Sequence, residues 1–149
     1  MSTSPTPRFT VITLGVSNIR ASIAFYEALG FVKDPNFSGG HASALKWSDT
    51  ITFMVADKAF FSTLTPKPIA DPRASAQLLI ALSMDNRAEV DAICDKAAAA
   101  GGTTNASPPE DLGFMYSRDF ADPDGHGFGP FFMHPTAAPA SAPETEPAA

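Results

Sequence analysis

The side chains that could do chemistry in this 149-residue chain are few and far apart. His41, His126 and His134 form no His-x-His or His-x-x-x-His pair, so no two of them are spaced for local chelation of a metal ion. His126 could act as a metal ligand or a general base, although its place after a turn sequence favours a turn-capping role. His41 begins a strand-like segment and could touch a ligand, whereas His134 begins the polar C-terminal stretch.

Tyr116 and Arg118 alternate in a strand predicted from Phe114 to Phe120, so their side chains share one face. Arg118 could pair with a carboxylate or phosphate of a ligand, or equally form a surface ion pair with Asp119 or Glu110. Together with His41, these two residues are the candidate catalytic side chains.

Several other kinds of site are disfavoured. The single cysteine, Cys94, excludes an intramolecular disulfide, and its place on an apolar helical face favours a buried, unreactive thiol. The chain has no nucleophile elbow, phosphate-binding glycine loop or dinucleotide fingerprint.

The charge of the chain narrows the possible partners. A formal net charge of −6 and a pI near 4.8, with no Lys/Arg cluster, argue against sequence-independent binding to nucleic acid or an anionic membrane. No apolar run reaches the length of a membrane span, and the N-terminus lacks the features of a signal peptide. We therefore expect a cytoplasmic protein.

The elements that must position these side chains follow a repeated pattern. Residues 9–16 are strand-like, Ser17-Asn18 is a helix N-cap, and Gly30 lies where a helix C-terminal glycine belongs. Strands are predicted over 41–47 and 50–55, a loop over 35–40, and a short helix over 57–64.

The same order returns at an offset of about 68 residues, with a strand over 77–84, a helix capped by Asn86 and a stop at Gly101-Gly102. We expect a flexible arm (1–7), a first module (8–64), a linker (65–75), a second module (76–134) and a disordered Ala/Pro-rich tail (135–149).

The segment Leu14-Gly15-Val16-Ser17-Asn18, the run Phe25-Tyr26-x-x-Leu29-Gly30-Phe31 and the turn Asp122-Pro123-Asp124-Gly125-His126 resemble the vicinal oxygen chelate superfamily. This group includes glyoxalase I, bleomycin-resistance proteins and extradiol dioxygenases. The stretch from Phe60-Phe61 to Thr65–Pro68 is similar to an uncharacterised glyoxalase-like branch. The resemblance implies an α+β fold, in which two βαβββ modules form an open, cup-shaped mixed sheet with the helices outside.

In the superfamily, one divalent metal is held in the cup by His, Gln or Glu side chains. The positions of these ligands fall on Val11, Leu79 and Gly129, with a further position near Met54. None of the four can coordinate a hard divalent metal through its side chain. We therefore expect neither a metal nor another cofactor, the alternative being one divalent metal held through other ligands.

The resemblance also implies where a ligand would bind and a homodimeric state. The expected ligand-binding residues are Val11, Thr13, Trp47, Thr52, Met54, Gln77, Leu79, Tyr116, Arg118 and Gly129. Trp47 could stack on a planar ligand or lie at a subunit interface.

Three functions remain open. The first is metal-free binding of a small planar or aromatic molecule, the second a metal-dependent lyase, isomerase or dioxygenase reaction, and the third cofactor-independent catalysis.

Overall fold

The structure is a computed structural model that describes residues 5–6 and 8–135. The first module contains β1 (Thr10–Val16), α1 (Ile19–Ala28), β2 (Val32–Ser38), β3 (Ala42–Lys46) and β4 (Ile51–Asp57), and is followed by α2 (Lys58–Leu64). The second contains β5 (Ile80–Ser83), α3 (Arg87–Ala99), β6 (Thr103–Thr104), β7 (Glu110–Asp111), β8 (Met115–Ser117), β9 (Phe120–Ala121) and β10 (Gly127–Met133). The expected arm and tail fall largely on residues outside the described ranges.

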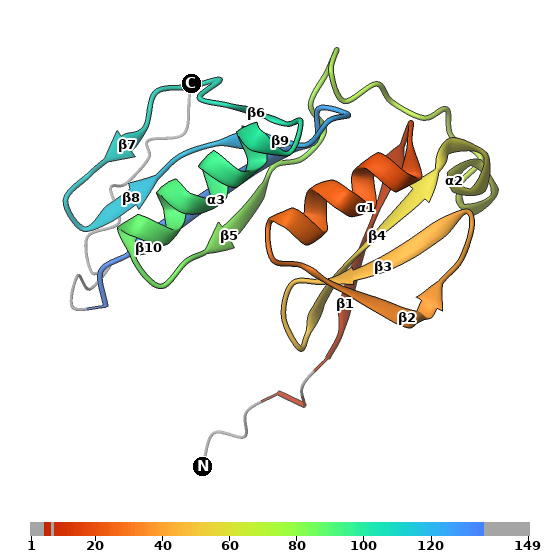
Figure 1. Ribbon diagram of the computed structural model, residues 1–149, viewed down its shortest axis with the longest axis horizontal. Coiled ribbons are helices and arrows are strands. Elements are labelled where there is room, and N and C mark those ends of the chain that lie inside the picture. Colours follow the sequence, from red (N-terminus) through yellow and green to blue (C-terminus); the bar gives the residue numbers. More distant parts are fainter. Residues whose placement is uncertain (1–4, 7, 136–149) are drawn as a thin grey trace, which may run out of the picture.

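Each module pairs its first strand in parallel with its last. The first sheet has the order β1-β4-β3-β2, with β1 parallel to β4. In the second sheet the order is β6-β9-β10-β8-β7, and β5 runs parallel to β10. The predicted α+β fold is thus confirmed, with two curled sheets forming the cup (Figure 1).

The helices begin and end where the sequence places them. Asn18 and Asn86 are N-caps, and each accepts a hydrogen bond from the backbone three residues on. The carboxylate of Glu89 accepts a hydrogen bond from the backbone amide of Asp85, one residue before the N-cap, which gives a capping-box-like pair with Asn86. Gly30 and Gly101 follow the two helices with φ values of 103° and 101°, which are costly for any residue with a Cβ atom.

Three sequence predictions need correction. β2 continues through Pro35 to Ser38, with a register shift between Asp34 and Ser38, because an edge strand tolerates the missing donor of proline. The strand predicted over 77–84 is limited to Ile80–Ser83. The strand predicted over 114–120 is divided into β8 and β9, which are separated at Arg118 and Asp119.

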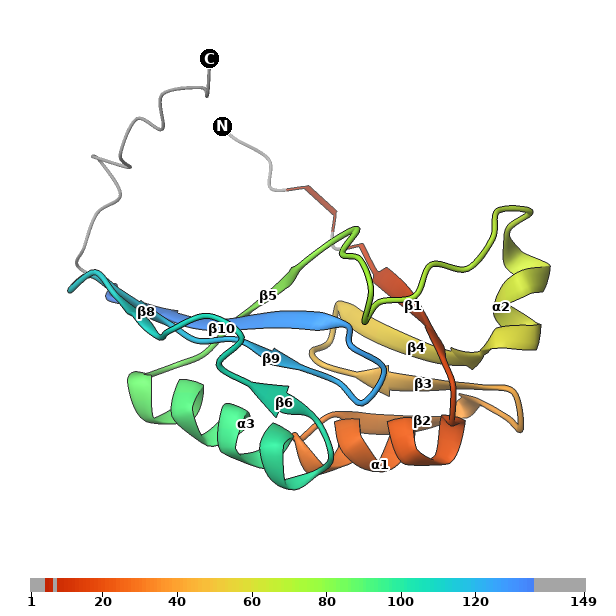
Figure 2. The ribbon, with the colours of Figure 1, turned by 90° about the horizontal axis from the view of Figure 1, so that it is seen from above.

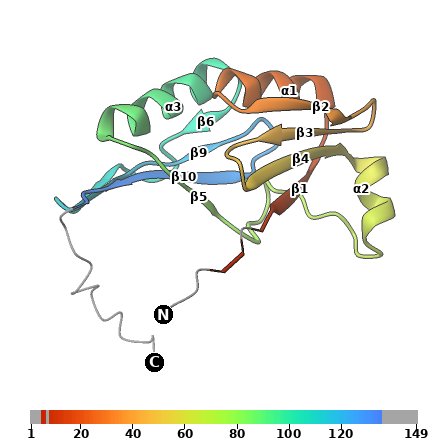
Figure 3. The same ribbon diagram turned by 90° about the horizontal axis from the view of Figure 1, so that it is seen from below.

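One aromatic core joins the two modules. Helices α1 and α3 lie side by side over one face of the sheets (Figures 2 and 3), and the core lies beneath them. Phe128 of β10 stacks on Phe120 at 4.9 Å between ring centroids and contacts Tyr26 of α1 and Phe53 of β4 at 5.9 and 5.8 Å. Burial of these rings therefore depends on both modules.

None of the helices within the described residues has the length and apolar character needed to cross a lipid bilayer.

Candidate ligand-binding site

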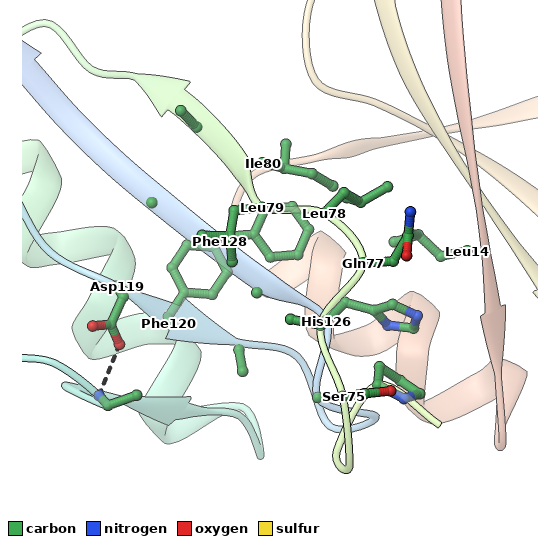
Figure 4. A pocket seen from close by; sticks show the side chains of 18 of the residues that line it. Leu14, Ser75, Gln77, Leu78, Leu79, Ile80, Asp119, Phe120, His126 and Phe128 are labelled. Atoms are coloured by element: carbon green, nitrogen blue, oxygen red, sulfur yellow. Dashed lines mark hydrogen bonds between the residues drawn. The ribbon is translucent and has the colours of Figure 1, made fainter. Parts of the chain in front are cut away.

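A cavity of about 1000 Å³ lies between the modules, beside β1, the segment from Phe61 to Ala81, β9 and β10. Its lining is mainly apolar and includes Phe61, Ile69, Leu78 and Leu79, and the buried core residues Phe120 and Phe128 border it from behind the strands. Figure 4 shows several of these side chains around the cavity. The volume and apolar lining are those of a pocket for a small organic molecule.

Residues with small side chains form one part of the cavity wall. Gly127 and Gly129 of β10 alternate with the buried Phe128 and Pro130, so the two glycines share the opposite face of the strand. Gly129 is paired with Ala81 of β5, and Gly127 with Ala121 of β9. All four small residues line the cavity. A Cβ atom at Gly127 would lie 3.0 Å from Cδ2 of Leu79, so Leu79 covers the wall there, whereas a Cβ atom at Gly129 would approach only the carbonyl oxygen of Arg118, at 3.9 Å.

Phe61 and Ile69 extend the wall across the first module. A Cβ atom placed on Gly15 would lie 3.3 Å from the Phe61 ring and 3.7 Å from Ile69, so both side chains pack closely over this part of β1. The linker after α2 thus contributes directly to the cavity.

His126 is the histidine that lines the cavity. Its Nδ1 lies 2.8 Å from Oδ2 of Asp122, and its side chain is 17% exposed, whereas that of Asp122 is fully buried. Figure 4 shows the imidazole ring directed toward the side of the cavity where Leu14 and Gln77 lie.

Asp122 is surrounded by hydrogen-bond donors. Its Oδ1 accepts from the backbone amides of Asp124, Gly125 and His126 at 2.8–3.0 Å, and its Oδ2 accepts from the phenol of Tyr26 at 2.7 Å. Burial raises the pKa of Asp122, but the hydrogen bonds from His126 and Tyr26 and the charge of His126 together hold this pKa below its ordinary value. Asp122 is therefore an ionised acceptor.

The side chains of the other candidate catalytic residues are held by partners outside the cavity lining, although Arg118 itself belongs to that lining. The face shared by Tyr116 and Arg118 is turned toward α3, where the Tyr116 hydroxyl donates to Oδ1 of Asp91 at 2.7 Å and Nη1 of Arg118 donates to the same atom at 3.0 Å. His41 is 76% exposed, and its Nδ1 lies 2.6 Å from Oδ2 of Asp57, the N-cap of α2.

Comparison with models of known protein families assigns the chain to one of them. Residues 8–129 match the model of the Glyoxalase/Bleomycin resistance protein/Dioxygenase superfamily. The chain belongs to this superfamily. The resemblance inferred from the Phe-Tyr and Asp-Pro-Asp-Gly-His segments is therefore confirmed.

Solved structures agree with this fold. A superfamily enzyme from Burkholderia phytofirmans has a TM-score of 0.72 at 17% identity, covering 85% of this chain and 98% of the other. The fosfomycin resistance protein FosX from Mesorhizobium loti has a TM-score of 0.65 at 16% identity, covering 91% and 100%. An antibiotic binding protein from Streptomyces sp. has a TM-score of 0.57 at 22% identity, covering 89% and 98%. Among curated proteins, none matches this sequence.

The residues present do not fit the divalent metal of metal-dependent superfamily members. Val11, Leu79 and Met54 present aliphatic or thioether side chains, and Gly129 presents none. Within residues 5–6 and 8–135, no group of three or more His, Cys, Asp or Glu side chains is arranged to hold a metal ion. These four positions therefore offer no side-chain ligand for a divalent metal.

Five of the ligand-binding residues expected from the sequence line the cavity. They are Thr13, Gln77, Leu79, Arg118 and Gly129. The guanidinium of Arg118 nevertheless donates hydrogen bonds to Asp91 and Asn105. The backbone carbonyl oxygen of Arg118 lies 3.9 Å from the position of a Cβ atom placed on Gly129. Leu79, which is 79% exposed, is the aliphatic residue of the five.

The remaining expected residues lie elsewhere. Val11, Thr52 and Met54 are on β1 and β4 but outside the cavity lining, as are His41 and Tyr116. Trp47 packs against Phe31 at 5.1 Å between ring centroids, on the helix-covered side of the sheet, because it continues the alternation of buried Leu45. Trp47 is therefore not among the residues that line the cavity.

Sequence reasoning missed the connection among Tyr26, Asp122 and His126. The signal within the turn was an Asp four residues before a His, a spacing that lets one carboxylate bind both the backbone and the ring of the histidine. The contact with Tyr26 spans 96 residues and had no local signal.

Proposed function

We propose that this chain binds a small planar or aromatic molecule in its cup without a resident divalent metal. The observation that carries the proposal is the small-residue wall of Ala81, Ala121, Gly127 and Gly129 inside a largely apolar cavity of about 1000 Å³. At Gly129 a metal-binding carboxylate would fill this space, whereas a glycine leaves the strand open to a flat ring. The antibiotic binding protein from Streptomyces sp. offers a precedent for binding on this fold.

A thermal-shift screen with planar aromatic metabolites and antibiotics tests the binding function. A ligand that raises the melting temperature of the full chain should lose at least about tenfold in affinity in Gly129→Leu, because the added side chain fills the wall. Gly39→Leu is the matched control, since a Cβ at Gly39 meets nothing within 4 Å. A screen without any stabilising ligand, or equal binding by both variants, would count against the proposal.

Elemental analysis tests the absence of a metal. Protein purified without chelators or a histidine tag should contain far less than one metal ion per chain. About one Ni, Zn, Mn or Fe ion per chain would overturn the metal-free proposal and favour the alternative lyase, isomerase or dioxygenase chemistry.

The proposal includes the homodimer that superfamily resemblance implies. Apolar side chains at Phe9, Phe37 and Leu79 are largely exposed in the single chain and offer surface for association. Light scattering at several protein concentrations measures the mass, and a monomer throughout would contradict this part of the proposal. The cytoplasmic location expected from the sequence stays a prediction.

A further inference from the structure

His126 is held in one orientation by a buried partner. Its Nδ1 lies 2.8 Å from the carboxylate of Asp122, which also receives three backbone amides and the Tyr26 hydroxyl. An ionised carboxylate can only accept hydrogen bonds, so Nδ1 must carry a proton in this contact. In the neutral ring, Nε2 is then an unprotonated acceptor.

Nε2 of His126 is the ring nitrogen that does not contact Asp122. None of the described residues donates to it or accepts from it, and it is not among the buried polar atoms that lack a partner. It is therefore accessible, and His126 lines the large cavity between the modules. The small second pocket, beside Arg73 and Pro123, does not include this residue.

The neighbouring charged groups of the second module are already paired. Arg118 donates to Asp91, and the carboxylate of Asp119 accepts the backbone amides of Ala106 and Ser107 at 2.8 Å each. The remaining charged residue of the lining is Lys67, on the linker. His126 thus combines a fixed orientation with an unused nitrogen beside the small-residue wall.

We propose that His126 is the polar anchor of the cavity and that it selects planar aromatic ligands bearing an acidic hydroxyl group. This inference rests on the proposed binding function. The ligand O–H bond breaks as the Nε2–H bond forms, so one proton moves and no co-reactant is needed. The resulting imidazolium is stabilised by Asp122, and Nε2–H donates to the ligand oxyanion. An aromatic ether lacks this proton and leaves Nε2 without a donor.

Two probes that differ at one oxygen test this selection. 4-Nitrophenol has the acidic hydroxyl, whereas in 4-nitroanisole a methyl group replaces the proton. At a pH below the pKa of free 4-nitrophenol, the wild-type chain should bind 4-nitrophenol about tenfold more tightly, and the bound probe should show the phenolate absorption band. His126→Asn should lose both the preference and the band but keep the affinity for 4-nitroanisole.

The outcomes separate this inference from the binding function. Equal affinity of the wild-type chain for both probes, without the phenolate band, would overturn the role of His126 and leave aromatic binding intact. A preference and band that persist in His126→Asn would do the same. Binding of neither probe would overturn both proposals.

A second measurement needs no variant. Nitrogen-15 NMR of the imidazole in the wild-type chain should show a proton on Nδ1 before and after binding, and 4-nitrophenol should change the signal of Nε2. A proton on Nε2 in the free chain, or an unchanged ring in the saturated complex, would contradict the inference.

Discussion

The phenol oxygen of Tyr26 donates a 2.7 Å hydrogen bond to Oδ2 of Asp122, which lies 96 residues further along the chain. Both side chains are buried, and the bond connects α1 of the first module to the turn between β9 and β10 of the second. Burial, followed by the charge of Asp122, raises the pKa of Tyr26 well above its ordinary value, so the phenol stays a donor.

We expect Tyr26→Phe to lower the free energy of unfolding by about 1–3 kcal/mol, because it leaves a buried carboxylate with one donor fewer. Urea denaturation followed by circular dichroism measures the change. A difference below about 0.5 kcal/mol would show that this hydrogen bond does little to stabilise the fold.

The low pKa of Asp122 predicts an acid-sensitive fold. A carboxyl whose pKa is lower in the folded chain stabilises the fold above its unfolded pKa of about 4 and loses this contribution as the pH falls through the folded value. The free energy of unfolding should therefore decrease from about pH 5 toward pH 2, and Asp122→Asn should show a smaller decrease. Asp57, Asp91 and Asp111, whose pKa values are also lowered, account for the remaining slope. Identical slopes in the two proteins would contradict this assignment.

Gly102→Ala should destabilise the chain by at least about 2 kcal/mol. A Cβ atom at Gly102 would collide with the carbonyl oxygen of Ala121 and lie 2.7 Å from Cε2 of Phe25. Gly39→Ala is the control, since open space surrounds that position and its stability should change little. Thermal unfolding of both variants checks the contrast, and similar melting temperatures would count against it.

Tyr116→Phe should leave ligand affinity unchanged, in contrast to the catalytic or binding role considered from the sequence. Its hydroxyl contacts Asp91 on α3 and lies outside the cavity lining. We expect a stability loss of no more than about 1 kcal/mol, since the contact is only partly buried. Calorimetric titration with the best ligand of the screen measures the affinity, and a clear weakening would restore Tyr116 as a site residue.

Cys94 should resist thiol reagents in the folded chain. Burial raises the pKa of its thiol to about 11, while the nearby charge of Arg118 only partly opposes this rise. Ellman's reagent at mildly alkaline pH should react slowly with the native protein and fast after addition of urea. Rapid labelling of the native chain would show that α3 exposes this thiol.

Local sequence signals predicted the helices well but not the orientation of the site. Asn18 and Asn86 mark helix starts by capping chemistry that acts within three residues. The alternation of Tyr116 and Arg118 correctly gave them one face, but which face meets the cavity depends on Asp91 of a helix 25 and 27 residues away. Similarly, Trp47 could be placed only once β3 and Phe31 were in position.

Only some residues of the cavity wall could be predicted from the sequence, because their positions depend on neighbours that are distant along the chain. Gly129 and Leu79 were identified through family resemblance, which carries information about spatial neighbours that composition lacks. Phe61 and Ile69 were not identified as cavity residues, because their packing over Gly15 depends on the path of the linker, which has little regular secondary structure.

The shared aromatic core limits how a ligand can enter and leave. Phe128 touches rings from both modules, so swinging the modules apart about a hinge would expose Tyr26, Phe53 and Phe120 to water at once. Exchange should therefore proceed through the open side of the cup with the modules held together, past the linker (65–75), which supplies part of the cavity wall. The rate of ligand release should then be independent of the rate of global unfolding of the chain.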